Sequence, residues 1–402
     1  MNRNVWIILI SSALFNICLG IYDFVLPYYL RSINISYANM GLIFAVSAIL
    51  IFFLRLWVGS HSDRIGRKPF YSLGLAVSGV SILLTPLLPG LLLQAALKTL
   101  REASLIVRDT MRSILVYENV KTNYHGVISK IIGIEFFLQG AGTLLCGILM
   151  SGGFHFLTNE RFTIEKHNTT LPLLVCGIIL FAAFIFFSLT FKENYKRKEH
   201  AEGLKLKDLL KIDLPRELRL LTATNFIFTL GLSISHSFYM PLFFSEKFGI
   251  GATMVAMILM IHRSSLGIPM FIYGNFIKRK HFKSVYIITM LYEGLAIAVA
   301  ALIPNFWIAT GIWLTHDLLG AAFWSPIQNT YIQEFAREKS RGKDTSEVIA
   351  IGSLGGIIGP ILAGMLVAIS PGAVFLTSGI VTMLSVIPLF RLKDIARNSS
   401  NQ

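Results

Sequence analysis

Apolar positions occur along this chain in long blocks, and polar positions gather in segments between them. Runs of about 18 or more apolar residues recur, and such a run can cross the roughly 30 Å hydrocarbon core of a bilayer as a helix. The runs lack the two-residue alternation of a barrel wall, and a helix satisfies its own backbone groups in lipid. We therefore predict an all-α integral membrane protein with twelve transmembrane helices. The predicted helices cover residues 5–30, 37–58, 70–88, 90–116, 126–151, 171–191, 218–244, 251–276, 284–303, 305–334, 348–369 and 372–390.

The composition agrees with this class: 54% of the 402 residues are hydrophobic and 14% are charged, against roughly 25% charged residues in soluble domains. A net charge of +14 could suggest a nucleic-acid partner. The cations, however, lie in every second loop, as the positive-inside rule predicts for cytoplasmic loops. We therefore expect no nucleic acid, and a multi-pass protein of the inner (cytoplasmic) membrane with both termini in the cytoplasm. The other side carries few cations: Arg31, Arg161, Lys166 and Lys247.

The three cysteines, Cys18, Cys146 and Cys176, all lie inside apolar runs. We expect small buried residues, because their spacing fits neither a disulfide framework nor a metal site. The first apolar run begins like a signal peptide, but it continues well past the usual length and no clear cleavage pattern follows. We expect it to remain as the first transmembrane helix.

The longest polar segment, residues 192–217, divides the predicted helices into six and six. This division gives an N-terminal bundle over 1–191, a cytoplasmic linker over 192–217, a C-terminal bundle over 218–391 and a cytoplasmic tail over 392–402. Leucines interleaved with lysines in the linker fit a helix lying on the membrane surface, and a flexible tether fits equally well. The external loop 152–170 contains Asn168, in a sequon that matters only in a eukaryotic secretory pathway.

The two halves repeat several features at corresponding places. The first and seventh helices carry matching prolines near their outer ends, Pro27 and Pro241. A basic loop follows the second helix of each half, at residues 59–68 and 274–280. The fifth and eleventh helices are both rich in glycine, and small residues allow close helix contacts that suit either a moving interface or static packing.

The loop after the second helix carries a distinctive charged pattern. It consists of Gly59, Asp63, Arg64, Gly66, Arg67 and Lys68. This pattern resembles the signature Gly-x-x-x-Asp-(Arg/Lys)-x-Gly-(Arg/Lys)-(Arg/Lys) of the major facilitator superfamily of transporters. With twelve helices divided six and six, the resemblance covers essentially the whole chain. One departure is that the fifth helix lacks the glycine–proline motif of the family's drug–proton antiporters, and Gly359-Pro360 lies in the eleventh helix instead.

The resemblance implies the fold and the working principle of that family. It implies two six-helix bundles around a central cavity with alternating access, lined by the first, fourth, seventh and tenth helices. It also implies that Asp63 braces against the opposite bundle near the eleventh helix and holds the cytoplasmic side closed. The expected gate residues are Gly59, Asp63, Arg64, Gly66, Arg67 and Lys68, together with Arg108, Asp109 and Arg112 of the fourth helix.

Several ionisable residues lie inside the predicted spans. Placing one at mid-bilayer costs at least ~2.5–3.5 kcal/mol on insertion scales, so each is a candidate functional residue. At about 1.5 Å per residue, Arg101 and Glu102 lie near the midplane, and Glu135, Arg263 and Asp317 lie at comparable depth. Because Arg101 and Glu102 are adjacent, we expect them to point in different directions. Glu135 and Arg263 could instead form a structural pair between helices.

These charges suggest roles in transport. Arg101 and Arg263 suit a substrate with a carboxylate or another anionic group. Glu102, Glu135 and Asp317 are the candidate proton carriers, because a buried carboxylate can exchange its proton near neutral pH.

Among the aromatic residues, Tyr28 and Trp324 are the candidate substrate contacts. Glu293 lies on the predicted ninth helix, which the resemblance places at the periphery, so we expect it to be structural or to face lipid.

The sequence therefore predicts a secondary active transporter of a small organic solute, anionic or amphipathic, coupled to protons. Export is favoured on the resemblance alone. Charge-neutral facilitated uptake of a sugar-like or peptide-like solute is the second hypothesis, and a non-transporting sensor on the same fold is the third. We expect no enzyme, metal or cofactor, because the chain lacks a metal-ligand cluster, a nucleotide-binding loop and a nucleophile elbow. The expected partners of a monomer are the solute, protons and the lipid bilayer.

Overall fold

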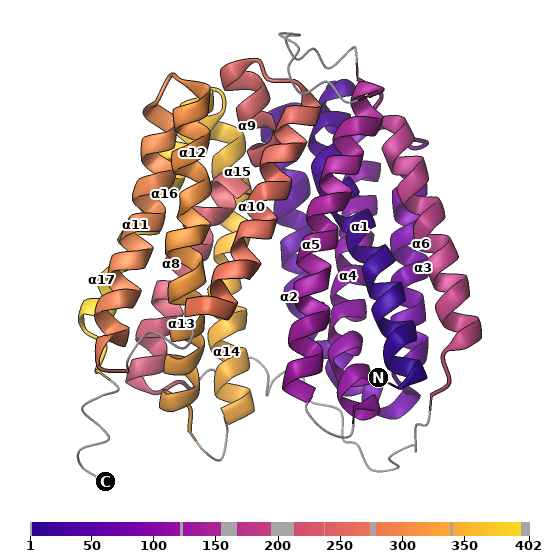
Figure 1. Cartoon of the computed structure of the whole chain (residues 1–402), viewed down its shortest axis with the longest axis horizontal. Coiled ribbons are helices and arrows are strands. Elements are labelled where there is room, and N and C mark those ends of the chain that lie inside the picture. Colours follow the sequence, from indigo (N-terminus) through magenta and orange to yellow (C-terminus); the bar gives the residue numbers. More distant parts are fainter. Residues whose placement is uncertain are drawn as a thin grey trace. The chain divides into compact units, whose positions relative to one another are not determined.

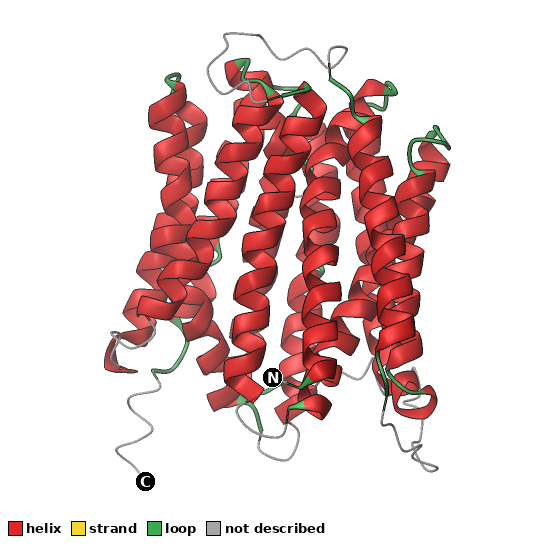
Figure 2. Ribbon diagram, turned by 45° about the vertical axis from the view of Figure 1, so that its right-hand side comes forward, coloured by secondary structure: helices red, strands yellow, loops and turns green. Residues whose placement is uncertain are grey.

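The computed structural model describes residues 2–120, 124–153, 167–193, 213–236, 238–273, 279–337 and 341–394. It describes the backbone alone at residues 50, 52–53, 55–65, 113, 117, 124–126, 128–130, 266–273, 326, 333, 341–343 and 345–346. Every regular element in these ranges is a helix (Figure 2). The chain divides into two compact units, Met1–Leu210 with Gly249–Arg263, and Lys211–Phe248 with Ser264–Gln402. The linker hypotheses concern residues 192–217, of which residues 194–212 lie outside the described ranges.

The first unit contains the six predicted N-terminal helices, coloured indigo to pink in Figure 1. They are α1 (Arg3–Ser32), α2 (Tyr37–Ile65), α3 (Lys68–Leu84), α4 (Leu91–Asn119), α5 (Tyr124–Ser151) and α6 (Thr170–Thr190). The unit also includes the first part of α10 (Ala252–Tyr273). Each of the six helices follows its predicted span, which confirms that the apolar runs set the positions of the helices.

The second unit contains the C-terminal helices, and several of its predicted spans are interrupted. Its elements besides α10 are α8 (Arg216–His236), α9 (Tyr239–Phe248), η2 (Arg279–His281), α11 (Phe282–Leu302), α12 (Phe306–His316), the π-helix η3 (Asp317–Ala321), α13 (Ala322–Phe335), α14 (Arg341–Ser353), α15 (Gly355–Leu366), α16 (Pro371–Leu384) and α17 (Ile387–Phe390). Four predicted spans are built from consecutive elements, namely α8 with α9, α12 through α13, α14 with α15, and α16 with α17. The described helices therefore account for the twelve predicted spans, and seven of them are long and apolar enough by themselves to cross a membrane.

Glycines bring corresponding helices together in the two units. In the first unit, a Cβ atom on Gly142 of α5 would lie 2.0 Å from the carbonyl oxygen of Ile17 in α1. In the second unit, a Cβ atom on Gly355 of α15 would lie 2.5 Å from the carbonyl oxygen of Phe226 in α8. The backbones approach so closely that only glycine fits. The repeated glycines of the fifth and eleventh spans thus serve close packing against the first and seventh spans.

A second repeated contact joins the outer helices of each unit. Gly79 of α3 packs against the backbone of Gly177 in α6, and Gly294 of α11 packs against the backbone of Gly379 in α16. The features that repeat between the two halves of the sequence therefore correspond to pairs of helices that pack in the same way in each unit.

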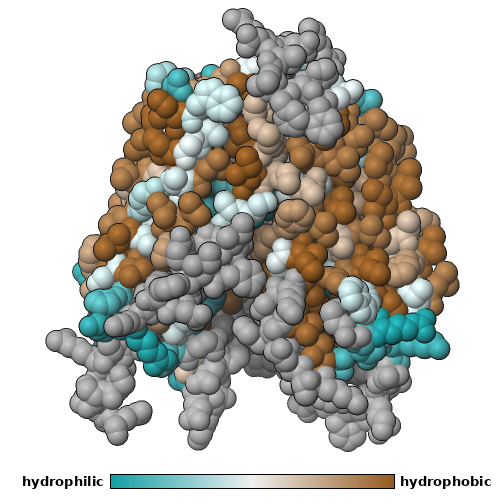
Figure 3. Space-filling model, viewed as in Figure 1, coloured by the Kyte–Doolittle hydropathy of each residue, from teal (hydrophilic) through white to brown (hydrophobic). Residues whose placement is uncertain are grey.

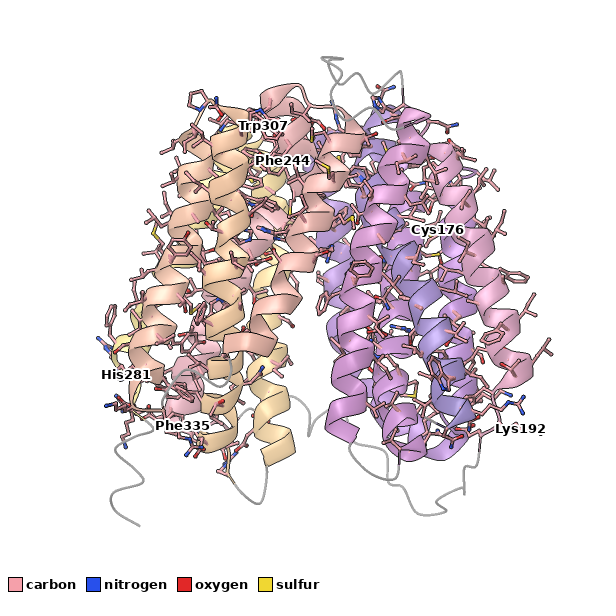
Figure 4. The ribbon with its side chains drawn as sticks, in the orientation of Figure 1. Cys176, Lys192, Phe244, His281, Trp307 and Phe335 are labelled. Atoms are coloured by element: carbon pink, nitrogen blue, oxygen red, sulfur yellow. The ribbon has the colours of Figure 1, made fainter. Side chains whose placement is uncertain are left out.

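The cysteines behave as small buried packing residues. Cys176 of α6, labelled in Figure 4, and Cys18 of α1 each donate the thiol hydrogen to the other's carbonyl oxygen, with sulfur–oxygen distances of 3.3 and 3.4 Å. Cys146 is also buried, and all three are free thiols. The prediction of buried, unlinked cysteines is confirmed.

The helices expose large apolar side chains along their length, which appear brown in the space-filling view of Figure 3. Lipid-facing helices are expected to have such a surface. Trp307 lies at one end of α12 (Figure 4), where an exposed tryptophan fits the interface between hydrocarbon and water. The most exposed of these side chains include Leu92, Leu189, Leu302, Trp307 and Ile369.

Candidate functional site

A network of charged side chains joins α1 and α4 in the first unit; we call it the central network, comprising Asp23, Lys98, Arg101, Glu102 and Gln139. Arg101 donates from Nη2 to Asp23 Oδ1 at 3.2 Å and from Nη1 to Glu102 Oε1 at 2.5 Å. Lys98, one helical turn before Glu102, donates to the same Glu102 oxygen. Two cations of α4 are therefore held by two carboxylates.

The central network continues to α5 and α10 through an amide. Gln139 donates from Nε2 to Asp23 Oδ2 at 3.4 Å, and its Oε1 accepts from Arg263 Nη1 at 3.0 Å. Arg263 is thus connected to Asp23 through Gln139. The two arginines predicted to bind an anionic substrate, Arg101 and Arg263, both contact this network.

The exposure of the two carboxylates differs. The Asp23 side chain is 36% exposed, whereas that of Glu102 is 14% exposed. The Arg101 guanidinium is 2% exposed and lies over the ring of Tyr22, 4.5 Å from its centroid. The prediction that Arg101 and Glu102 point in different directions is wrong, because the two side chains pair with each other.

A second charged cluster lies further along α4. Arg108 donates from Nη2 to Glu135 Oε1 of α5 at 3.1 Å, and Arg112 donates to the other oxygen of Glu135. Arg108 also pairs with Asp109, and it lies over the ring of Phe15 at 4.4 Å from the centroid. The suggested pair of Glu135 with Arg263 does not form. Glu135 instead holds two arginines of α4.

The described part of the signature loop fixes the start of α3. Gly66 has a φ of +104°, which favours glycine, and a Cβ atom there would lie 3.0 Å from Glu193 Oε2. The backbone N–H groups of Arg67 and Lys68 donate to Glu193 Oε1 at 2.6 and 3.1 Å. Arg67 also pairs with Glu118 at the end of α4, over 3.1 Å. At the other loop residues, Gly59, Asp63 and Arg64, the structure describes the backbone alone.

An analogous ion-pair group lies at the same predicted side of the second unit. Arg337 donates to Asp344 Oδ1 at 2.7 Å and to Asp213 Oδ2 at 2.8 Å. The hydrogen bonds to Asp344 and then to Asp213 raise the pKa of the Arg337 guanidinium above its ordinary value. The group ties the segment before α8 to the connection between α13 and α14.

The second unit contains an acidic site around Glu293 of α11. Its side chain is 1% exposed, and Trp324 of α13 donates its indole N–H to Glu293 Oε2. Asp317, the first residue of the π-helix η3, lies near Glu293 and 3.4 Å from His316 Nε2. The suggestion that Glu293 faces lipid is wrong, because the side chain points into the unit. The polar contact of Trp324 is with this acid.

Tyr28 lies in the core of the first unit. It is fully buried, and its ring lies 5.3 Å from that of Phe24 on the same helix. Substrate contact by Tyr28 stays a prediction.

The sequence interpretation did not single out Lys98 and Gln139, and it considered Glu293 only as a structural or lipid-facing residue. Lys98 and Gln139 belong to the central network, and Glu293 is the buried acid of the second unit. The signal for Lys98 was present, because it precedes Glu102 by four positions and such residues meet on one helix face. No spacing rule connects Glu293 to residues on other helices.

Comparisons with known proteins agree with this architecture. A model of the Major Facilitator Superfamily matches residues 8–345 and 224–402. A comparison with curated proteins finds no match. Among solved structures, the nucleoside transporter NupG gives a TM-score of 0.79 at 14% sequence identity, covering 97% of this chain and 100% of NupG.

Two further solved structures have the same fold. A bacterial homologue of the human lysosomal transporter Spinster gives a TM-score of 0.72 at 14% identity, covering 96% of this chain and 94% of that one. The human organic anion transporter TETRAN gives a TM-score of 0.66 at 14% identity, covering 97% of this chain and 99% of TETRAN. The family match spans nearly the whole sequence and agrees with the twelve spans and the signature loop. The chain belongs to the Major Facilitator Superfamily of membrane transporters.

Proposed function

We propose that this protein is a secondary active transporter that carries a small organic anion together with a proton across the cytoplasmic membrane. We place both termini in the cytoplasm and take the monomer as the working unit. The observation that carries the proposal is the attachment of the deeply buried Arg101 to the partly exposed Asp23.

The ion pairs of the central network support an anionic solute. Lys98 and Arg101 are held by Asp23 and Glu102, and Arg263 contacts the network through Gln139. An arginine can hold a carboxylate with two parallel hydrogen bonds, so a solute carboxylate is a good replacement for Asp23. Glu102 is harder to displace, because Lys98 and Arg101 both hold it.

The same exchange supports coupling to protons. When a solute anion displaces Asp23 from Arg101, the released carboxylate faces the site without its cation. The pair of Asp23 and Arg101 is neutral before the exchange, so a proton that enters with the anion restores the charge balance of the site. Anion and proton then bind together, and each strengthens the binding of the other.

This linkage argues for symport, and therefore for uptake down an inward proton gradient. Export was favoured on family resemblance alone, and no contact in the central network supports it. NupG is described as a nucleoside transporter and TETRAN as an organic anion transporter. The buried Arg101, whose carboxylate partner Asp23 a solute carboxylate can replace, favours an anion over an uncharged nucleoside for this chain.

Binding and transport assays with defined probes test the proposal. Benzoate and lactate should raise the melting temperature of the purified protein, and uridine should not. In proteoliposomes, an inwardly directed proton gradient should drive accumulation of at least one of the acids. Accumulation that is independent of the gradient would support facilitated uptake instead, and no flux of any probe would support the sensor hypothesis.

The substitution Arg101→Lys provides the site-specific test. Lysine keeps the charge but cannot make the two parallel hydrogen bonds, so benzoate affinity should fall. Arg279→Lys is the matched control, because Arg279 of η2 is 60% exposed and pairs with Glu334 of α13. Unchanged benzoate affinity in Arg101→Lys would show that the anion binds elsewhere.

A further inference from the structure

Glu293 is a buried acid for which the described residues provide no cation. Its carboxyl group accepts one hydrogen bond, from the indole N–H of Trp324. No lysine, arginine or histidine of the described residues lies within ion-pair distance of it. Glu102 and Glu135, by contrast, are each held by two cations. Isolated charged carboxylates are rarely buried, because the loss of water around the charge is too costly and the group becomes neutral instead.

The surroundings of Glu293 contain a second acid and a histidine. Of the elements that pack against α11, η3 contributes Asp317 and α12 contributes His316, which lies next to Asp317. His236 of α8 lies beyond His316, with a distance of 5.5 Å between the ring centroids. Helix α13 contributes Trp324, and α16 contains no titratable residue. The cations of η2 precede the first residue of α11, whereas Glu293 lies near the middle of this helix.

Local backbone geometry holds the two acids close together. The π-helix η3 begins at Asp317 and places Gly320 against Glu293. A Cβ atom on Gly320 would lie 2.8 Å from the Cβ atom of Glu293, so a larger residue would push the helices apart. Single π-helical turns of this kind are often found at functional sites.

We propose that Glu293 and Asp317 form a proton-binding site of the second unit, in which Glu293 carries the proton and Asp317 exchanges it. Trp324 occupies Oε2 of Glu293, so the proton resides on Oε1. It passes from Oε1 to a carboxylate oxygen of Asp317, which loses its negative charge as Glu293 gains one. His316 Nε2, 3.4 Å from Asp317 Oδ1, is the next acceptor. This inference rests on the proposed proton-coupled function and names a residue that carries the proton.

Infrared difference spectroscopy of the purified protein tests the site with the proton itself as the probe. The wild-type protein should show a carboxylic acid C=O band at neutral pH that is absent from Glu293→Gln. Glu334→Gln is the control, because Glu334 is 38% exposed and paired with Arg279, and its band pattern should equal that of the wild type. A band that persists in Glu293→Gln, or its absence from the wild type, would overturn the proposal.

A second variant separates the proton site from a general folding defect. Trp324→Phe removes the indole donor and leaves the acid in place, so the band should remain and move to higher frequency as its hydrogen bond is lost. A variant whose band does not move would show that Trp324 does not contact the protonated acid, against the proposal.

Transport provides the functional readout. Glu293→Gln should retain benzoate exchange between equal concentrations and lose accumulation driven by a proton gradient. Gradient-driven accumulation equal to that of the wild type would contradict the inference. If the wild type itself accumulates no acid, the proposed function fails, whereas the infrared result still decides whether Glu293 holds a proton.

Discussion

Replacing Asp23 by asparagine tests how the central arginine is controlled. Asp23→Asn keeps the shape of the side chain and removes the charge that competes with a solute anion for Arg101. The pair joins a guanidinium that is 2% exposed to a carboxylate that is 36% exposed. Exposed pairs contribute about 0.2–1 kcal/mol, and breaking a buried pair costs about 3–5 kcal/mol. A partly exposed pair should lie between these limits, at about 1–2 kcal/mol.

This free energy sets the expected gain in affinity. Since about 1.4 kcal/mol corresponds to a tenfold change in a binding constant, Asp23→Asn should bind benzoate roughly 5–30-fold more tightly than the wild type at alkaline pH. The sign follows from the linkage: in the wild type the anion must displace Asp23, whereas in the variant no carboxylate has to leave. Wild-type affinity should therefore rise as the pH falls, and the affinity of the variant should not.

Isothermal titration of benzoate at acidic and alkaline pH measures both effects. Asp109→Asn is the matched control, because Asp109 also pairs with an arginine of α4 but lies in the other cluster and is 42% exposed. Its benzoate affinity and pH dependence should equal those of the wild type. Weaker or unchanged binding by Asp23→Asn, or a pH dependence that survives the substitution, would refute the displacement argument.

Three further changes have definite expected outcomes. Glu135→Gln should destabilise the protein by about 3–5 kcal/mol, because it removes the buried acid that holds both Arg108 and Arg112, whereas loss of the partly exposed acid in Asp109→Asn should cost about 1 kcal/mol or less; thermal unfolding of both variants measures the difference. Gly142→Ala would place a Cβ atom 2.0 Å from a carbonyl oxygen of α1 and should lower the melting temperature, whereas Gly311→Ala, with no atom within 4 Å, should not. Asp63→Asn should slow transport of a bound acid while leaving its affinity nearly unchanged, and a variant with normal turnover would return the loop to a purely topological role.

The fold could be predicted almost completely from the sequence because one physical requirement dominates it. A membrane span needs a long apolar run, and the twelve runs set the places of the helices within a few residues. The positions at which a span is interrupted could not be predicted from the same pattern. Nothing in the apolar pattern around Asp317 indicates a π-helix, because the pattern records which residues face lipid and not how each carbonyl is paired.

The partners within the candidate site could be predicted only in part. Depth along a helix follows from counting residues, and it placed Arg101, Glu102 and Glu135 inside the spans. The structure buries Arg101 and Glu135 and leaves 14% of the Glu102 side chain exposed. The direction of a side chain depends on the rotation of the helix and on its bending, and neither follows from position alone. For this reason Glu135 was considered as a partner of Arg263 although it holds Arg108.

The partners of each acid decide which of the predicted proton carriers can work. To take a proton, Glu102 would have to leave Lys98 and Arg101, and Glu135 would have to leave Arg108 and Arg112. Both acids therefore fit the role of fixed counter-charges that keep arginines inside the membrane. Among the described residues, Asp23 pairs with a single cation and is partly exposed, and Glu293 pairs with none. Proton coupling is therefore best sought at these two acids, one in each unit, and a double variant Asp23→Asn with Glu293→Gln should still bind benzoate while losing all dependence on the proton gradient.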